Sequence, residues 1–253
     1  MDTTRHLGRI ALVTGAASGI GRATVLRLAQ EGAAVIGCDV DSVGLDATRA
    51  VVTAAGATAE FVVADVTDQA DIDRLVEAAG PRIDILANVA GIMDHFLPLA
   101  ELDDATWDRV LAVNLTGVMR LSRAVVPIMQ RNGGGAIVTV ASKGSLGAGV
   151  SGTAYATSKH GVIGLVRSIA YFYGPDGIRS NAVLPGAVAT GIWSTAEPRA
   201  AWAMERAQLA MATMPPTPAE PDEIATVISW LASDEASNVN GGLLSADGGW
   251  SAA

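Results

Sequence analysis

The sequence predicts a single-domain α/β protein, built on a doubly wound parallel sheet of about seven strands with helices on both faces. Short runs rich in β-branched residues alternate with longer segments that have the apolar spacing of helices. No linker or change in composition divides the 253 residues. Because 50% of the residues are hydrophobic and only 17% are charged, the chain can bury a substantial core.

The predicted elements alternate along the whole chain. We expect strands at residues 10–14, 34–39, 59–64, 83–88, 136–141, 180–184 and 243–245. We expect helices at residues 19–31, 42–55, 69–79, 104–131, 153–173 and 222–233. Such alternation indicates right-handed β-α-β units, and ligands of such sheets bind at the carboxyl ends of the strands.

Residues 187–221 are the one irregular stretch, and we expect them to form a lid over a substrate site. The stretch contains Trp193 and Trp202 and ends in the proline-rich run 215–221. A long segment of this kind beside a compact α/β domain more often covers a site than separates two domains.

Charge and composition argue against several classes of protein. The net charge of −9, without any run of Lys or Arg, argues against binding to nucleic acid. Met1 to Arg9 contains no apolar signal core, and we find no uninterrupted apolar stretch that would span a bilayer. We therefore expect a soluble, cytoplasmic protein without a membrane partner.

Cysteine and histidine give no sign of a disulfide framework or a metal site. Cys38 is the only cysteine, and it lies in an apolar run where a buried structural thiol is expected. The three histidines, His6, His95 and His160, are scattered and lack ligand spacing. We expect no metal, and we expect His95 and His160 to be structural.

A glycine-rich turn follows the first predicted strand. Thr14–Gly21 contains Gly15, Gly19 and Gly21, where the backbone can approach a pyrophosphate closely. The free N–H groups at the start of the next helix favour that negative charge. The spacing differs from Gly-x-Gly-x-x-Gly, so the turn alone indicates a nucleotide only weakly.

Asp39 ends the second predicted strand and favours NAD as the cofactor. Its carboxylate can accept hydrogen bonds from both hydroxyls of an adenosine ribose, and it would repel a 2′-phosphate. Ser18 and Val40, beside it, bring no cation that would receive such a phosphate. The alternative is an ordinary polar residue at a strand end.

Tyr155 and Lys159 stand four residues apart in a predicted helix, and Lys143 is the only other lysine in the chain. Residues at i and i+4 share a helix face, so the ammonium can lie beside the phenol. A nearby cation favours the phenolate and lowers its pKa, which suits proton transfer. Such a pair also arises by chance, so other motifs must decide.

These motifs resemble, in order and spacing, those of the short-chain dehydrogenase/reductase family over about residues 9–250. They are Thr14–Gly21, Asn88-Val89-Ala90-Gly91, Asn114, Ser142, Tyr155-x-x-x-Lys159 and Pro185-Gly186. The resemblance implies a Rossmann-type fold, a nicotinamide cofactor and hydride exchange with an alcohol or carbonyl. Val89 departs from the family, which usually has a second asparagine there that braces the sheet.

The resemblance also implies which residues bind the cofactor. Asp65 and Val66 would flank the adenine, whereas Val188 and Thr190 would hold the carboxamide and diphosphate. The full set is Gly15, Ser18, Gly19, Ile20, Gly21, Asp39, Val40, Asp65, Val66, Asn88, Ala90, Gly91, Tyr155, Lys159, Pro185, Gly186, Val188 and Thr190.

By the same resemblance, Asn114, Ser142, Tyr155 and Lys159 form the catalytic set. Ser142 would position the substrate oxygen, and Tyr155 would act as base in oxidation and as acid in reduction. Lys159 would lower the phenol pKa and bind the nicotinamide ribose, while Asn114 would hold a water that links Lys159 to solvent. Lys143 is expected on the surface, because neighbouring residues at a strand end point to opposite sides.

The candidate substrate pocket is largely apolar. Its expected residues are Met93, Ser142, Leu146, Ala148, Val150, Ala187, Trp193 and Trp202. Such a wall offers apolar area with few directional contacts, so we expect a small secondary alcohol or ketone that is cyclic or aryl-bearing.

Two rival functions stay open. A 3-oxoacyl-thioester reductase belongs to the same family, but such enzymes usually use NADPH and meet an acidic carrier through basic residues. A catalytically silent scaffold or redox sensor could keep the fold, although Tyr155 and Lys159 are both present here. In the family, the helices around 104–131 and 153–173 form a dimer interface, so we expect a homotetramer, with a dimer as the alternative.

Overall fold

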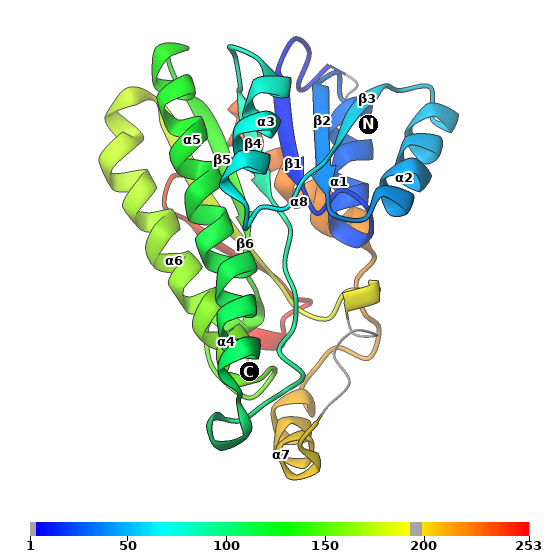
Figure 1. Cartoon of the computed structure of the whole chain (residues 1–253), viewed down its shortest axis with the longest axis vertical. Helices are drawn as coiled ribbons and strands as arrows, with labels where there is room; N and C mark the ends of the chain where they lie inside the picture. The colour runs from blue at the N-terminus through cyan, green and yellow to red at the C-terminus, as the bar shows by residue number, and fades with distance from the viewer. Residues whose placement is uncertain (1–3, 193–198, 253) are drawn as a thin grey trace.

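Within residues 4–192 and 199–252, which this computed structural model describes, seven parallel strands form one sheet (Figure 1). The strands are β1 (Ile10–Thr14), β2 (Ala34–Asp39), β3 (Ala59–Val63), β4 (Ile85–Asn88), β5 (Gly135–Val140), β6 (Ile178–Pro185) and β7 (Leu243–Ala246). Their order is β3-β2-β1-β4-β5-β6-β7. The predicted doubly wound parallel sheet is confirmed.

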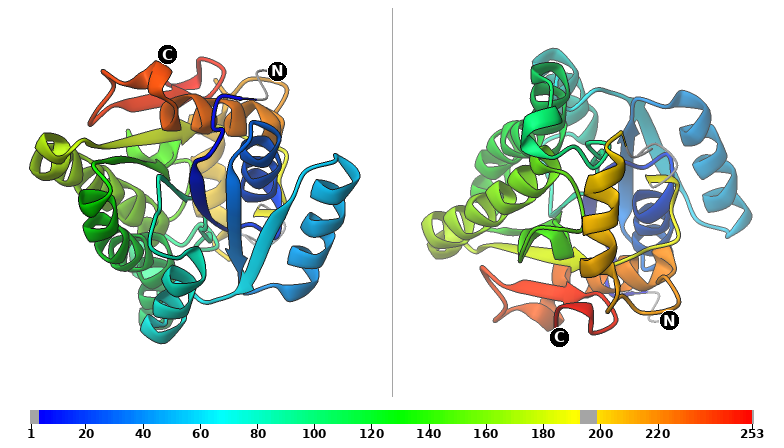
Figure 2. Two further views of the ribbon diagram at one scale, coloured as in Figure 1. Left: turned by 90° about the horizontal axis from the view of Figure 1, so that it is seen from above. Right: turned by 90° about the horizontal axis from the view of Figure 1, so that it is seen from below.

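Helices cover both faces of the sheet (Figure 2). One face packs against α1 (Gly19–Gln30), α2 (Ser42–Ala54) and α8 (Pro221–Ala232). The other packs against α3 (Gln69–Ala79), α5 (Val118–Arg131) and α6 (Thr153–Tyr173). In β1, Ala11 and Val13 face the first layer and Leu12 faces the second. A sheet buried on both faces requires apolar side chains at successive positions, which explains its apolar strand sequences.

Acidic side chains cap the N-termini of several helices by accepting hydrogen bonds from N–H groups of the first turn. Asp41 accepts from Gly44 at 3.0 Å, at the start of α2. Asp68 accepts from Ala70 at 2.7 Å, at the start of α3. A carboxylate is favoured at these positions because the first N–H groups of a helix lack partners within the helix.

The helix predicted at 104–131 is interrupted. It consists of α4 (Asp104–Leu111), a π-helical turn (Ala112–Gly117) and α5. The side chain of Asn114, inside the π turn, bonds to the backbone of Ile92 after β4. Such turns recur at functional sites, and no periodicity in the sequence marks this one.

The stretch 187–221, predicted to be irregular, contains a further helix, α7 (Ala201–Met211), which stands at the lower end of the molecule in Figure 1. Its composition is rich in strong helix formers. Ala207 is buried, and it belongs to an apolar cluster that includes Met93 and Tyr155. The helix therefore packs near the carboxyl ends of the strands.

The run Asp104–Arg131 is long and apolar enough to cross a membrane by length and composition alone, because it contains an 18-residue window with a mean hydropathy of 1.2. In the fold, 44% of that window is buried, and Leu121, Val125 and Met129 belong to the core. A core helix meets the same criteria, so this run supports a membrane span only weakly.

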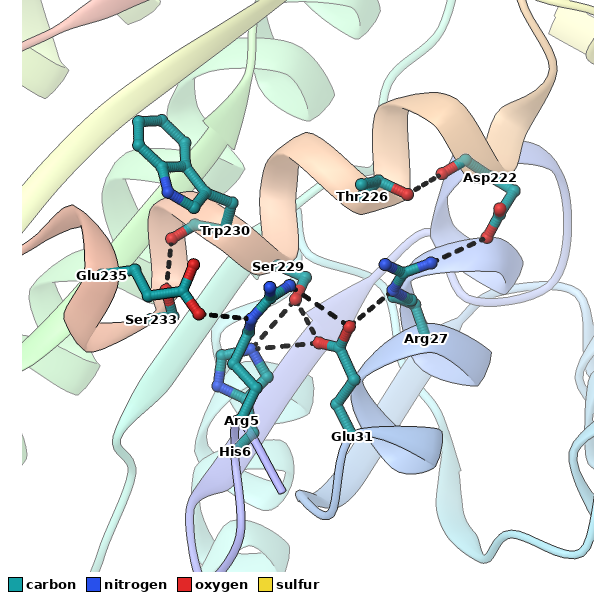
Figure 3. Close-up of polar contacts among 10 residues, drawn as sticks. All are labelled: Arg5, His6, Arg27, Glu31, Asp222, Thr226, Ser229, Trp230, Ser233 and Glu235. Carbon is teal, nitrogen blue, oxygen red and sulfur yellow. Dashed lines mark hydrogen bonds and ion pairs between the residues drawn. The ribbon is translucent and has the colours of Figure 1, made fainter. Parts of the chain in front are cut away.

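A buried carboxylate, Glu31, ends α1 and joins it to the N-terminal segment and α8 (Figure 3). Its Oε1 accepts hydrogen bonds from Arg27 Nε at 2.6 Å and Arg5 Nη1 at 3.4 Å. Its Oε2 accepts from the Ser229 hydroxyl and lies 3.5 Å from His6 Nε2. Burial lowers the pKa of His6, which favours the neutral ring in the fold. The cluster connects three segments that are distant in sequence.

Replacing Glu31 should destabilise the protein. In Glu31→Gln, two arginines lose their shared charge partner, so we expect the free energy of unfolding to fall by about 3 kcal/mol. Denaturant unfolding measures this change. Asp234→Asn is the control, because Asp234 pairs with Arg9 at 2.9 Å but its side chain is 87% exposed. That change should cost less than about 1 kcal/mol, and equal effects of the two substitutions would contradict the assignment.

Candidate active site

A cleft of about 680 Å³ opens where the strand order reverses between β1 and β4. Thr14 joins these strand ends, because its Oγ1 accepts hydrogen bonds from the N–H groups of Val89 and Ala90, both at 3.0 Å. The cleft thus lies at the carboxyl edge of the sheet, where doubly wound folds bind ligands.

Most of the predicted cofactor residues line this cleft. They are Gly15, Ser18, Gly19, Ile20, Gly21, Asp39, Val40, Asp65, Val66, Ala90, Gly91, Tyr155, Lys159, Pro185, Gly186, Val188 and Thr190. Asn88 differs from the prediction and does not line the cleft. Its Nδ2 donates to Ser122 Oγ at 3.3 Å and lies 3.4 Å from Thr139 Oγ1. Because β4 extends through Asn88, that side chain lies on the α5 face of the sheet. Its hydrogen bonds connect β4 to α5 and β5.

The turn after β1 leaves room that only glycine provides. A Cβ on Gly15, whose φ is +71°, would lie 2.9 Å from Ala90 N, and one on Gly21 would lie 1.9 Å from Gly15 O. Ser18, the N-cap of α1, makes no side-chain capping bond, so the first N–H groups of α1 are left for an anion. These residues fit the diphosphate of a dinucleotide.

Asp39 is held in a fixed orientation at the end of β2. Its Oδ2 accepts a hydrogen bond from Ala17 N, and its Oδ1 accepts one from Asp41 N, both at 3.1 Å. Each carboxylate oxygen has further lone pairs, so the group can still accept from ribose hydroxyls. Val40 and Ser18 line the cleft beside it and carry no positive charge.

Helix α6 brings Tyr155 and Lys159 to the cleft wall. Both are buried, and Lys159 Nζ lies 5.6 Å from the centroid of the Tyr155 ring. Lys159 Nζ donates a hydrogen bond of 2.8 Å to Val140 O at the end of β5. Burial lowers the pKa of Lys159 to about 8, because desolvation disfavours the ammonium. A bound anionic or hydroxyl ligand would favour the charged form again.

The Ser142 hydroxyl and the Tyr155 phenol both belong to this wall. Burial raises the pKa of Tyr155, whereas interaction with the Ser142 side chain lowers it. The Ser142 Oγ also accepts from Gly144 N at 3.0 Å, in the short turn after β5. A ligand oxygen placed here would meet a hydroxyl, a phenol and, just behind them, an ammonium.

Asn114 lies behind the cleft wall and is fully buried. Its Oδ1 accepts from Ile92 N at 2.8 Å, and its Nδ2 donates to Ile92 O at 2.9 Å and to Ser158 Oγ at 3.2 Å. A Cβ on Gly91 would lie 3.4 Å from both Asn114 Oδ1 and Lys159 Nζ, so the two side chains approach the same point. Asn114 therefore braces the chain after β4 against α6.

The predicted substrate residues are only partly brought together. Met93, Ser142 and Val150 line the cleft, and Ala187 does not. Leu146 is exposed, and Ala148 borders a separate surface depression with His160. Both differ from the prediction, because the chain turns away from the cleft after the 3-10 turn Lys143–Ser145.

Of the two tryptophans predicted for the lid, Trp202 does not line the cleft. Trp202 is exposed, and its Nε1 donates to Glu101 Oε1 at 2.9 Å on the outer side of α7. Trp193 lies outside the described residues. An apolar side chain on an exposed helix face cannot be distinguished by composition from one that faces the cleft.

Lys143 and Trp250 are among the cleft residues that the sequence did not predict. Lys143 Nζ lies 4.8 Å from the centroid of the Trp250 ring. Lys143 was expected on the surface, but strand alternation ends at Val140, and the following 3-10 turn carries Ser142 and Lys143 to the same cleft. The rarity of lysine in the chain is the signal that could have found it.

Asp94 is another residue that sequence reasoning missed. Its buried carboxylate caps α6, because Oδ1 accepts from Gly152 N at 3.0 Å and Oδ2 accepts from Tyr155 N at 2.8 Å. A Cβ on Gly152 would lie 2.5 Å from Asp94 Oδ2. The next residues, His95 and Phe96, have φ of 57° and 56°, which non-glycine residues rarely adopt. This strained turn sets the position at which α6 presents Tyr155.

The cleft combines a glycine-rich turn at the strand crossover, Asp39 at the end of β2, and the group Ser142, Tyr155 and Lys159 in its wall. These are the features of a Rossmann-type nucleotide-dependent oxidoreductase. The chain belongs to the short-chain dehydrogenase/reductase family. The family model described as enoyl-(acyl carrier protein) reductase matches residues 15–251. The family predicted from the motifs is confirmed.

Curated relatives cover essentially the whole chain. A 3beta-hydroxysteroid dehydrogenase of Eggerthella lenta is 40% identical and covers 100% of both chains. A cis-4-hydroxycyclohexanecarboxylate dehydrogenase of Sinomonas cyclohexanicum is 42% identical, with 96% of this chain and 97% of that protein covered. Relatives of this kind support an alcohol/ketone oxidoreductase.

Solved structures show the same fold. Levodione reductase matches with a TM-score of 0.90 and 40% identity, covering 98% of this chain and 100% of that one. A protein from Beutenbergia cavernae, described as an NAD(P)-dependent gluconate 5-dehydrogenase with NADP bound at low occupancy, matches with a TM-score of 0.88 and 38% identity. It covers 100% of both chains. Within the described part of this chain, no group of three or more His, Cys, Asp and Glu is placed to hold a metal.

Asp94→Asn should loosen the start of α6 and lower the pKa of Tyr155. The amide cannot accept both N–H bonds, so we expect a loss of about 2 kcal/mol in unfolding free energy. The negative charge of Asp94 raises the pKa of Tyr155, and its removal should lower that pKa. Ultraviolet titration of tyrosinate measures this in a Tyr171→Phe/Tyr173→Phe background, which leaves Tyr155 as the only tyrosine. An unchanged Tyr155 titration would contradict this role for Asp94.

Proposed function

We propose that the protein is an NAD(H)-dependent dehydrogenase/reductase that interconverts a secondary alcohol and a ketone on a substrate with an apolar cyclic or aryl-bearing skeleton. The observation that carries this proposal is the meeting of Ser142, Tyr155 and Lys159 in one cleft wall, next to the glycine cradle. A hydroxyl that holds an oxygen and a phenol that moves a proton are what alcohol/ketone chemistry requires.

In this proposal, the bound nicotinamide supplies the hydride acceptor for oxidation or the hydride donor for reduction. Ser142 holds the substrate oxygen by a hydrogen bond. Tyr155 takes the hydroxyl proton in oxidation and returns it to the carbonyl oxygen in reduction. Because Lys159 donates one N–H to Val140 O, two remain for the ribose hydroxyls, and its charge favours the phenolate.

Tyr155→Phe tests the proton transfer. The substitution keeps the ring and removes only the phenol oxygen, so kcat should fall about 10³-fold while NAD binding changes little. Steady-state kinetics and a fluorescence titration of the cofactor measure the two quantities. Tyr173→Phe is the matched control and should leave both unchanged. Turnover that survives in Tyr155→Phe would refute the proposed mechanism.

Asp39 supports the preference for NAD. The carboxylate lines the cleft near the turn after β1, and Ser18 and Val40 beside it are uncharged. Charge repulsion would oppose a 2′-phosphate at this point, and carboxylate acceptors would favour two free hydroxyls.

Asp39→Ala should therefore reduce the preference for NAD. Loss of charge-assisted hydrogen bonds should lower kcat/KM for NAD about 10- to 100-fold, while NADP should be used as well as before or better. Kinetics with each cofactor measure the ratio. Asp46→Ala, which removes an exposed carboxylate on α2, is the control. Equal losses with both cofactors would indicate a structural role for Asp39.

The apolar part of the cleft supports a cyclic substrate. Ile92, Met93, Val150 and Ile192 line it, and Trp250 adds an aromatic surface. The relatives named for a hydroxysteroid and a hydroxycyclohexanecarboxylate act on ring alcohols, which agrees with this wall. A panel of secondary alcohols tests the proposal, and turnover confined to sugars or open-chain polyols would refute it.

A thioester reductase is the second candidate, favoured by the description of the matching family model as an acyl carrier protein reductase. The net charge of −9 opposes contact with an acidic carrier protein. Assay of the wild-type chain with acetoacetyl and crotonyl thioesters separates the two candidates. Higher kcat/KM on a thioester than on every cyclic ketone would reverse their order.

We also propose a homotetramer in the cytoplasm. The outer side of the α5 and α6 layer faces away from the sheet, and the last turn of α6 carries Tyr171 and Phe172, which are both exposed. Large exposed apolar side chains on one helix layer favour association between copies of the chain.

A further inference from the structure

Lys143 occupies an unusual position for a cation. It lines the cleft beside Ser142, and its ammonium rests on the face of Trp250 at 4.8 Å from the ring centroid. Among the described residues, no carboxylate lies within ion-pair distance of it, although the chain has an excess of acids. An ammonium that remains unpaired in an acidic protein is available to an anion from outside.

The Trp250 ring that carries this ammonium is itself held in place. Trp250 is buried, its Nε1 donates to Ala210 O on α7 at 3.1 Å, and its backbone N–H donates to Asp247 O at 3.2 Å. The cation–π contact with Trp250 restricts the Lys143 side chain. Less side-chain entropy is therefore lost when a ligand binds, which favours recognition.

Charge is unevenly distributed along the cleft. The lining carboxylates are Asp39, the last residue of β2, and Asp65, which follows β3. At the Ser142 end, the lining contains the ammonium groups of Lys143 and Lys159, while the nearby Asp94 is fully buried behind the wall. Arg109 on α4 also lines the cleft, but its side chain is exposed. Lys159 is directed to Val140 O, so Lys143 is the cation next to Ser142 that remains for a substrate.

We propose that Lys143, supported by Trp250, binds a carboxylate on the substrate, and that the preferred substrates are ring alcohols or ketones that carry an acid group. The inference rests on the proposed function, because Ser142 must hold the reacting oxygen at the other end of the same ring. The hydroxycyclohexanecarboxylate named for one relative has both groups on one ring. Apolar residues of the same cleft, such as Met93 and Val150, suit contact with the ring itself.

The test compares a charged and an uncharged ketone of nearly the same shape, 4-oxocyclohexanecarboxylate and its methyl ester, with saturating reduced cofactor. Wild type should prefer the acid at least 10-fold in kcat/KM. Lys143→Met keeps the apolar stem and should lose about 10- to 100-fold on the acid, chiefly through KM, with a much smaller change on the ester. Lys143→Arg should recover most of the preference because the charge is restored.

Competitive inhibition gives a second measurement that does not depend on turnover of the acid. Cyclohexanecarboxylate should inhibit ester reduction by wild type and should inhibit Lys143→Met about 10-fold more weakly. Trp250→Leu should weaken inhibition in the same direction, whereas Trp202→Leu, on the exposed side of α7, should not.

The outcomes separate this inference from the proposed function. If wild type reduces both ketones equally, or if Lys143→Met loses both activities to the same extent, the carboxylate site is refuted while ketone reduction stands. If wild type reduces neither ketone nor any other cyclic ketone, the proposed function itself fails.

Discussion

The reversal of strand order between β1 and β4 is the constraint on which the rest of the structure depends. Chain segments wind away from this point in both directions, so two strand ends separate and leave a cleft. The Thr14 hydroxyl spans the gap by accepting from Val89 N and Ala90 N, which fixes the distance between the glycine turn and the chain after β4. Gly15 has to be glycine because that distance is short.

The chain after β4 transmits this geometry to α6. Within a few residues, Ile92 bonds to Asn114 in the π turn, and Asp94 bonds to the first N–H groups of α6. Neither polar side chain lines the cleft, yet both connect the segments that do. Buried hydrogen bonds of this kind are costly to leave unmade, so the position of Tyr155 follows from the sheet rather than from α6 alone.

The sequence predicts the sheet, most helices and the nucleotide side of the cleft well, because strand ends and glycine turns have local patterns. Residues whose placement depends on where a strand stops were misplaced. Lys143 lies in the cleft because β5 ends at Val140. Asn88 lies on the α5 face of the sheet because β4 extends to it. Asp94 was missed for a different reason, since its partner helix is more than fifty residues away and no local pattern connects them.

The chain's use of cations now has a physical interpretation. In the part of the chain that the structure describes, every ion pair with a carboxylate involves an arginine, apart from that of His6, whereas both lysines line the cleft. A guanidinium stays charged when buried and forms forked pairs, which suits fixed bridges such as Arg27 with Glu31. An ammonium is compact, can rest on one ring face, and changes its pKa with burial, as Lys159 does. Lysine therefore supplies the cations in the cleft beside Ser142 and Tyr155, whereas arginine supplies the fixed ion pairs.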